Sequence, residues 1–304
     1  EKLSLWSEFG PLIAFKPDVI HLVNSFIYPK FEPWIDAIEA KLVVSFRGYD
    51  IAVRPWADLQ WSECLQRLFS HADALHFVSA YLRDEAINLG APVPACKVIH
   101  PSTAISAIQG KEKNLISNDK FKIVSTGRLT WQKGYHNALI AIKDLMDKGV
   151  QIEYSILGGG TELDHLLYLV RVLGLTHCVQ LKGAQPQEEV SRHLLDADIY
   201  FHPSETEAIP VAIMEAAMLG KAIIATNIGG IPEIVTHKVN GWLVPAFDTK
   251  EMTEALYLLC MNPELRIGLG AEAQKMARHR FSVQRECKEW EDLYLSIKSN
   301  EEGP

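Results

Sequence analysis

The sequence predicts an α/β protein built from two doubly wound, Rossmann-like halves. Short apolar runs rich in β-branched residues alternate with segments of helix length. The runs are almost continuously apolar, which is typical of parallel strands covered by helices on both faces. A polar stretch rich in Lys, Asn and Ser, residues 109–120, is predicted to link two domains. We therefore expect two parallel sheets facing a cleft, with ligands outside the carboxyl ends of the strands.

The two halves differ in their number of predicted strands. In chain order the predicted strands are 18–23, 41–46, 73–78 and 97–100, then 121–126, 152–157, 178–182, 198–202, 221–225 and 242–244. The chain opens on Glu1 rather than Met, and its first half shows fewer strands, so we expect the first domain, 1–108, to be incomplete. The second domain is predicted to be 121–281.

The last segment, 282–304, is predicted to be a C-terminal helix that packs back across the domains. An apolar stripe marks its helical part, 282–298, and consists of Trp290, Leu293, Tyr294 and Ile297.

Composition narrows the function classes. The 304 residues carry a formal net charge of −8, which argues against a nucleic-acid-binding surface. The five cysteines are odd in number, widely spaced and without a CxxC pair, so neither a disulfide framework nor a zinc site is expected. Reduced thiols favour the cytosol. No apolar run approaches the roughly 20 residues that span a bilayer, and no signal peptide pattern is present.

Two loops after predicted strands carry residues suited to phosphate. In the first, Gly127 permits a sharp turn, Arg128 offers a planar fork, and Lys133 adds a mobile cation. The loop is not a Walker A motif. The second loop, 158–160, is Gly-Gly-Gly and permits close backbone approach to a ligand. Taken alone, two cations after a strand more often belong to a solvated surface, and three glycines more often form a flexible turn.

Two carboxylates surround the predicted start of a helix, Glu207 before it and Glu215 within it. Pro210 suits the first turn of this helix and Gly220 suits its end. Exposed amides at the helix start can receive an anion. Apolar and small neighbours surround Glu215, and sugar hydroxyls would satisfy such a carboxylate. The alternative for Glu215 is a solvated or salt-bridged side chain.

A Gly-Gly turn follows the strand 221–225, and a new helix is predicted near Pro232. Glu233 falls in its first turn, where a capping role and a ligand role are equally plausible. Asn240 and Gly241 then predict a tight turn.

Together these motifs resemble the GT4 family of retaining glycosyltransferases, which have the GT-B fold. The similarity covers about 18–290 and is closest to exopolysaccharide or colanic-acid-type enzymes. The motifs that carry it are Gly127-Arg128, Lys133-Gly134, Gly158-Gly159-Gly160, Pro203-Ser204, Glu207 with Glu215 eight positions later, Gly220, Gly229-Gly230, Glu233 and Asn240-Gly241. Weaker similarities in the first half lie at 16–21, 45–50 and 78–92.

The resemblance implies a role for each matching residue. Arg128 and Lys133 would bind the donor diphosphate, Glu215 the ribose, and Glu207 the transferred sugar. The catalytic residues would be Glu207, Arg128 and Lys133. The remaining donor-binding positions would be Gly158, Gly159, Ile209, Pro210, Val211 and Ala212. The first domain would serve the acceptor and the second the donor.

The implied reaction moves a hexosyl group from a nucleotide-diphosphate sugar to a glycan or lipid-linked acceptor, with retention. Developing negative charge on the leaving diphosphate would be stabilised by Arg128 and Lys133, so neither a metal nor another cofactor is expected. Family members commonly carry His where Arg47 stands, so Arg47 is expected near the donor sugar, although it cannot act as a base. A lipid-linked acceptor would bring a cytoplasmic protein to the inner face of the cell membrane.

Two alternatives remain open at this point. The chain could be a truncated or degenerate nucleotide-sugar-binding protein without transfer activity, as the incomplete first domain and Arg47 suggest. It could instead be a GT-B nucleotide-sugar 2-epimerase, which needs no acceptor. Oligomeric state, donor base, sugar and acceptor are not predicted.

Overall fold

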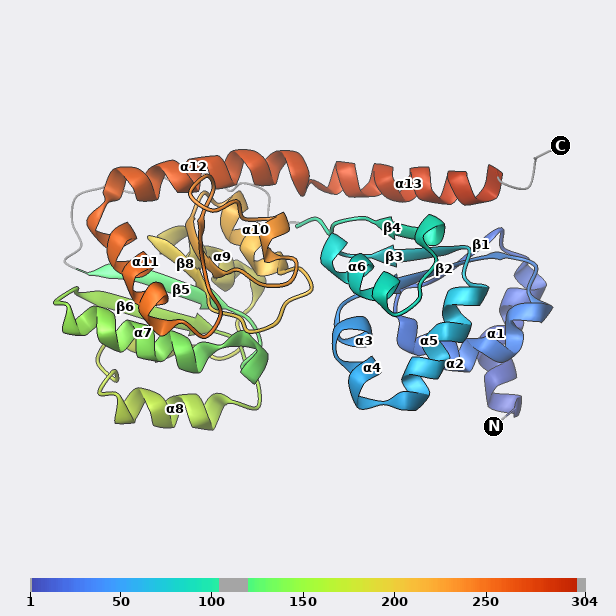
Figure 1. Ribbon diagram of the computed structural model, residues 1–304, viewed down its shortest axis with the longest axis horizontal. Helices are drawn as coiled ribbons and strands as arrows, with labels where there is room; N and C mark the ends of the chain where they lie inside the picture. The colour runs from blue at the N-terminus through green and yellow to red at the C-terminus, as the bar shows by residue number, and fades with distance from the viewer. Residues whose placement is uncertain (1, 104–119, 300–304) are drawn as a thin grey trace. The chain divides into compact units, whose positions relative to one another are not determined.

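The computed structural model describes residues 2–103 and 120–299 (Figure 1). The chain divides into two compact units, Glu1–Pro101 with Gln284–Pro304, and Ser102–Val283. The linker predicted at 109–120 lies outside the described residues except for Lys120. Each unit is described separately below.

The first unit contains a four-stranded parallel sheet in the order β1-β2-β3-β4. Its strands are β1 (Val19–Leu22), β2 (Lys41–Phe46), β3 (Ala74–Phe77) and β4 (Cys96–Val98). Its helices are α1 (Lys2–Phe15), α2 (Tyr28–Phe31), α3 (Tyr49–Ala52), α4 (Arg54–Ala57), α5 (Leu59–His71), α6 (Ala80–Asn88) and α13 (Val283–Ser299). Residues on β2 and β3 are almost wholly buried, as expected for parallel strands with both faces covered.

Helix α13 covers one face of this sheet, as Figure 1 shows. Leu293 and Ile297 pack with Val43, Ala74 and Ile99 in one buried cluster. The predicted apolar stripe therefore faces the sheet of the first unit. Two residues of the stripe, Trp290 and Tyr294, lie at the margin of this cluster.

A chain of polar side chains runs under α13 across three strands. Tyr294 Oη lies 2.8 Å from His21 Nδ1, and His21 Nε2 lies 2.7 Å from Ser45 Oγ. Ser45 Oγ in turn lies 2.7 Å from His76 Nδ1, and His76 Nε2 lies 3.0 Å from the carbonyl oxygen of Ile99. Since a carbonyl only accepts, His76 Nε2 carries the hydrogen, and burial lowers the pKa of His76 to about 4. This row of hydrogen-bonded side chains is therefore uncharged, and it joins α13 to the sheet.

The second unit contains a six-stranded parallel sheet in the order β10-β9-β8-β5-β6-β7. Its strands are β5 (Phe121–Thr126), β6 (Ile152–Leu157), β7 (Val179–Leu181), β8 (Ile199–His202), β9 (Ala222–Thr226) and β10 (Trp242–Val244). Its helices are α7 (Tyr135–Asp147), α8 (Leu163–Val172), α9 (Gln187–Asp196), α10 (Val211–Met218), α11 (Thr249–Met261) and α12 (Pro263–Arg280). Counted within the unit, this order is the Rossmann order, with its switch point between β5 and β8.

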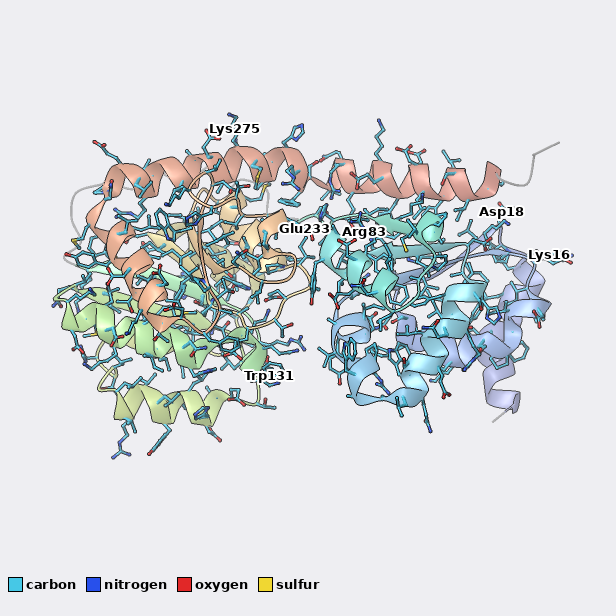
Figure 2. The ribbon with its side chains drawn as sticks, viewed as in Figure 1. Lys16, Asp18, Arg83, Trp131, Glu233 and Lys275 are labelled. Atoms are coloured by element: carbon cyan, nitrogen blue, oxygen red, sulfur yellow. The ribbon has the colours of Figure 1, made fainter. Side chains whose placement is uncertain are left out.

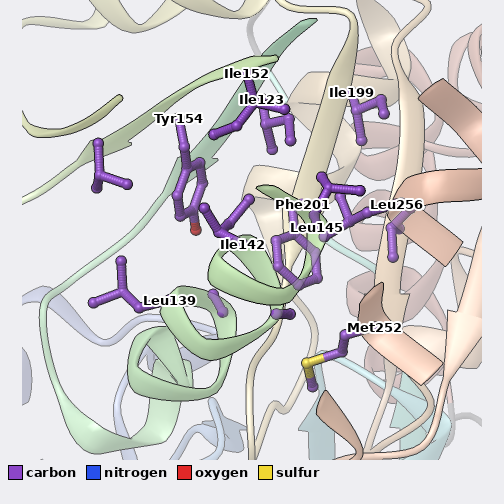
Figure 3. Close-up of a cluster of buried hydrophobic side chains, with 14 of the residues drawn as sticks. Ile123, Leu139, Ile142, Leu145, Ile152, Tyr154, Ile199, Phe201, Met252 and Leu256 are labelled. Carbon is purple, nitrogen blue, oxygen red and sulfur yellow. The ribbon is translucent and has the colours of Figure 1, made fainter. Parts of the chain in front are cut away.

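The core of the second unit lies between the sheet and two helices, α7 and α11 (Figure 3). The sheet contributes Ile123, Ile152, Tyr154, Ile199 and Phe201, α7 contributes Leu139, Ile142 and Leu145, and α11 contributes Met252 and Leu256. Each fully buried aliphatic side chain contributes roughly 1.5–3 kcal/mol relative to exposure. This core fixes the strands whose carboxyl ends carry the candidate site.

All ten predicted strands are present, and most differ from the prediction only at their ends. The prediction of a new helix near Pro232 is wrong, because only a 3₁₀ turn, Ile231–Glu233, forms there. The Asn240 side chain accepts from the Thr236 amide at 2.6 Å and donates to the Ile234 carbonyl at 2.9 Å. These bonds satisfy backbone groups that a helix would have used, so the segment closes as a loop.

Candidate functional site

The predicted donor-site residues of the second half gather around the switch point of the six-stranded sheet. The loop after β5 carries Arg128 and Lys133, and the loop after β8 carries Glu207. Because β5 and β8 are adjacent and parallel, both loops leave the same edge of the sheet. Ligands of doubly wound proteins bind at this edge.

Glycines allow the loops around this edge to touch. A Cβ atom on Gly158 would lie 1.8 Å from the carbonyl oxygen of Gly127, and one on Gly160 would lie 2.3 Å from that of Leu129. The Leu129 amide also donates to the Gly159 carbonyl at 2.9 Å. The three glycines were expected to admit a ligand or to form a flexible turn. Here Gly158 and Gly160 let the β6–α8 loop pack against the β5–α7 loop, whereas a Cβ atom on Gly159 would meet only Ala184, at 3.8 Å.

Two further glycines bring neighbouring loops against the segment that carries Glu207. A Cβ atom on Gly134 would lie 2.1 Å from the Pro203 carbonyl oxygen, and one on Gly229 would lie 1.8 Å from the Glu207 carbonyl oxygen. Both glycines have positive φ, 61° and 49°. Any larger residue at Gly134 or Gly229 would push the loops apart. The segment 203–207 is therefore held between the backbones of these two loops.

Lys133 and Glu207 form an ion pair across 74 residues of sequence. Their side chains are 18% and 10% exposed, so water screens the pair weakly. Burial opposes ionisation of Glu207, but hydrogen bonds from His202 and Lys133 and the positive charge of Lys133 outweigh it and hold its pKa at about 2. Glu207 is therefore an anion at neutral pH.

Arg128 is exposed and lies on the same loop as Lys133. Within residues 2–103 and 120–299, no ion pair or hydrogen bond of its guanidinium group is recorded. Trp131, 56% exposed, stands on the 3₁₀ turn Trp131–Lys133 that follows (Figure 2). Arg128 is thus a cation available to a ligand at the same edge.

Helix α10 begins and ends where the sequence predicts. Pro210 is its N-cap residue, and Gly220, with φ of 69°, follows its end. Ile209 is buried before it, and the amides of Val211 and Ala212 belong to its first turn. The first amides of a helix have no intrahelical acceptor. This segment can therefore present N–H groups to an anion.

Glu215 lies inside α10 and is half-buried. Burial raises its pKa, and a hydrogen bond of 3.1 Å from Gln187 Nε2 partly offsets this effect. Burial raises the pKa of Tyr200, and the negative charges of Glu215 and Glu207 raise it further, so both carboxylates act electrostatically on the same tyrosine. The structure thus brings the two predicted carboxylates to one region.

Glu233 stands in the 3₁₀ turn of the Gly229–Gly230 loop (Figure 2). Its amide donates to the Gly230 carbonyl at 3.2 Å. The capping role predicted for Glu233 required a helix that does not form, whereas its ligand role stays a prediction.

Arg47 belongs to the first unit. Its Nε donates to the Val23 carbonyl at 2.9 Å, and it lines a cavity of about 270 Å³ with His21, His76 and Trp290. The cavity lies at the carboxyl ends of the strands of the first sheet.

Sequence reasoning missed the neighbours that hold Glu207. His202 Nε2 lies 2.8 Å from Glu207 Oε1, and Ser204 Oγ lies 3.0 Å from the same oxygen. Both residues are buried. The available signal was a pair of polar residues, Tyr200 and His202, in a strand that is otherwise apolar.

Within the described residues, no group of three or more His, Cys, Asp or Glu side chains could hold a metal ion. Among the helices of that same part of the chain, none combines the length and apolar character needed to cross a membrane.

Two family models match the chain. The model for glycosyl transferases group 1 matches residues 108–276, and the model for a glycosyl transferase 4-like domain matches residues 3–102. The identification drawn from the motifs is confirmed.

Known relatives point the same way. The chain is 32% identical over 231 residues to the amylovoran biosynthesis glycosyltransferase AmsK of Erwinia amylovora, covering 74% of this chain and 56% of the relative. It is 28% identical over 251 residues to a D-inositol 3-phosphate glycosyltransferase of Corynebacterium jeikeium, covering 77% of this chain and 60% of that protein. The chain thus spans little more than half the length of these relatives.

The solved structure of Anabaena HepE in complex with UDP superposes with a TM-score of 0.79 at 20% identity, covering 93% of this chain and 82% of that one. This likeness confirms the predicted fold class, GT-B with Rossmann-like parallel sheets.

Proposed function

The chain belongs to the family of glycosyl transferases group 1, and from that premise we propose that the protein transfers a sugar from a nucleotide-diphosphate sugar to a glycan or lipid-linked acceptor in polysaccharide biosynthesis. The observation that carries the proposal is the Lys133–Glu207 ion pair at the switch point, with the exposed Arg128 on the same loop as Lys133. Cations and a clamped carboxylate at this edge suit a diphosphate and a sugar ring together. Relatives that work on amylovoran and on inositol phosphate support the reaction class.

In the proposed mechanism, Arg128 and Lys133 bind the diphosphate while the bond from the sugar to its phosphate oxygen breaks. Negative charge grows on the departing oxygen, so these cations bind the transition state more tightly than the ground state. Amides of Val211 and Ala212 add N–H donors to phosphate. Glu215 accepts from the ribose hydroxyls, and Glu207 faces the transferred sugar, whose ring gains oxocarbenium character.

We further propose retention of configuration and no metal requirement. Proton NMR of the product anomer tests the first, and activity that survives excess EDTA supports the second. The complex of HepE with UDP makes UDP-sugars the first donors to try. A lipid-linked acceptor would bring the protein to a membrane surface.

The deciding experiment measures binding of UDP, GDP and ADP by calorimetry. Each charge-assisted hydrogen bond contributes about 1.5–3 kcal/mol, so Arg128→Ala should weaken nucleotide binding at least about tenfold, and Arg128→Ala with Lys133→Ala more than about a hundredfold. Lys143→Ala removes a surface lysine of the same unit that pairs with Asp147, and should leave binding unchanged. Unchanged affinity in the double variant would refute the site.

A further inference from the structure

A buried polar chain lies beneath Glu207. His202 ends β8 with 3% of its surface exposed, and its Nδ1 lies 3.2 Å from Tyr200 Oη. Tyr200 Oη lies 3.1 Å from Thr126 Oγ1 at the end of β5. This row of buried polar side chains therefore crosses from β5 to β8, under the switch point of the sheet.

Chemistry fixes the hydrogen on the His202 ring. Glu207 is ionised and only accepts, so the His202 Nε2 beside it must carry a hydrogen. Burial lowers the pKa of His202, so the ring is neutral and its Nδ1 is an acceptor. Tyr200 Oη lies 3.2 Å from this acceptor and has one hydrogen to donate, with Thr126 Oγ1 3.1 Å away as a second partner. The Glu207 carboxylate therefore fixes the His202 tautomer, with its hydrogen on Nε2.

All three recorded bonds to the Glu207 carboxylate end on one oxygen. Oε1 accepts from Lys133 Nζ, His202 Nε2 and Ser204 Oγ. Within the described parts of the chain, no hydrogen bond to Oε2 is recorded. The protein thus holds Oε1 by hydrogen bonds, and Oε2 is available to a ligand.

We propose that His202, assisted by Ser204, is a positioning residue that fixes Glu207 so that Oε2 meets the donor sugar. This inference rests on the proposed function. Lys133 alone could not do this, because a bound diphosphate competes for its three N–H donors. The two neutral donors hold the carboxylate in place while Lys133 turns to phosphate.

The first test needs no ligand. The full chain, labelled with ¹⁵N at histidine, is examined by NMR at pH 7, with His202→Gln to assign the signals. We expect a neutral ring protonated at Nε2, and a change in its signals in Tyr200→Phe. A ring protonated at Nδ1, or a charged ring, would overturn the proposal.

The second test compares UDP with UDP-glucose. His202→Phe should leave the affinity for UDP within twofold of that of the wild type. It should reduce at least tenfold any extra affinity that UDP-glucose has over UDP, or the turnover of UDP-glucose. His202→Gln keeps an N–H donor and should restore most of it. A purely structural role predicts equal losses for UDP and UDP-glucose in both variants, and that result would overturn the proposal.

Ser204→Ala is a second variant for the case that His202→Phe does not fold, because it removes one hydrogen-bond donor to Glu207 with little loss of volume. It should reduce the glucose-dependent affinity or turnover with UDP affinity unchanged, and no change in either would count against the proposal. If the wild type binds no nucleotide at all, the proposed function fails, and the NMR result alone decides the positioning of His202.

Discussion

Replacing Lys133 by methionine should expose how strongly the site depends on the charge of Glu207. The ordinary pKa of a glutamate is 4.5, and that of Glu207 is about 2. The difference of about 2.5 corresponds to about 3 kcal/mol of net stabilisation of the carboxylate, because one pH unit is about 1.4 kcal/mol. His202 and Lys133 share this stabilisation. Lys133→Met should therefore destabilise the second unit by about 2 kcal/mol at pH 7.

The assay is a double-mutant cycle with Glu207→Gln. Hydrogen exchange of peptides from β8 reports the opening free energy of the second unit, and peptides from the first unit provide an internal reference. Coupling between the two substitutions should be about 1–2 kcal/mol, since Glu207→Gln removes the charge that Lys133→Met leaves unpaired. Lys143→Met, which breaks the exposed pair with Asp147, should cost less than about 0.5 kcal/mol.

The sign of the pH dependence provides a second check. The folded pKa of Glu207 lies below the unfolded one, so its contribution is present above pH 4.5 and is lost as the pH falls towards 2. The coupling should follow this course. Additive substitutions at pH 7, or coupling that persists unchanged in acid, would refute the reasoning about this pair.

Two other predictions concern loop packing and the helix α13. Gly158→Ala would place a Cβ atom 1.8 Å from the Gly127 carbonyl oxygen, so calorimetry should show that the free energy of unfolding falls by several kcal/mol. Gly174→Ala is the control, because Gly174 has a φ of 71° and open space around it, and it should lower the free energy of unfolding by only about 1 kcal/mol. Equal costs would contradict the loop contact. Burial holds the folded pKa of His76 at about 4, below the ordinary 6.5, so the unfolded state binds more protons between these values. Hydrogen exchange of α13 peptides should therefore show about 2 kcal/mol less protection at pH 5 than at pH 7. His76→Gln should reduce this difference and leave the part due to His21, whose pKa burial also lowers.

The strands could be predicted because a buried strand needs apolar residues, and these are visible in the sequence. A strand such as β6, covered on both faces, must be apolar along its whole length, and this pattern is visible without any partner. The start and end of α10 were likewise predictable, because Pro210 and Gly220 act through local backbone geometry. Local chemistry thus determines what the sequence alone reveals.

Pairings across the sheet could not be predicted in the same way. The sequence suggests a phosphate role for Lys133 and a sugar role for Glu207, but not their ion pair, which depends on β5 and β8 being neighbours. His202 was missed for a related reason. A histidine in a buried strand is as compatible with ordinary packing as with a site, and only the position of Glu207 decides between them.

The glycines of the site show why activity data alone would mislead. Gly158 and Gly229 belong to motifs that suggest ligand contact, yet each packs on a neighbouring backbone. A substitution at either would move the loop that carries Arg128 or the one that carries Glu207, and would abolish binding without touching a ligand. Loss of activity at a glycine is therefore evidence of ligand contact only when the stability of the unit is unchanged. By that criterion, Arg128 is the residue whose substitution tests the ligand most directly, since it is exposed and no contact recorded in the described residues depends on it.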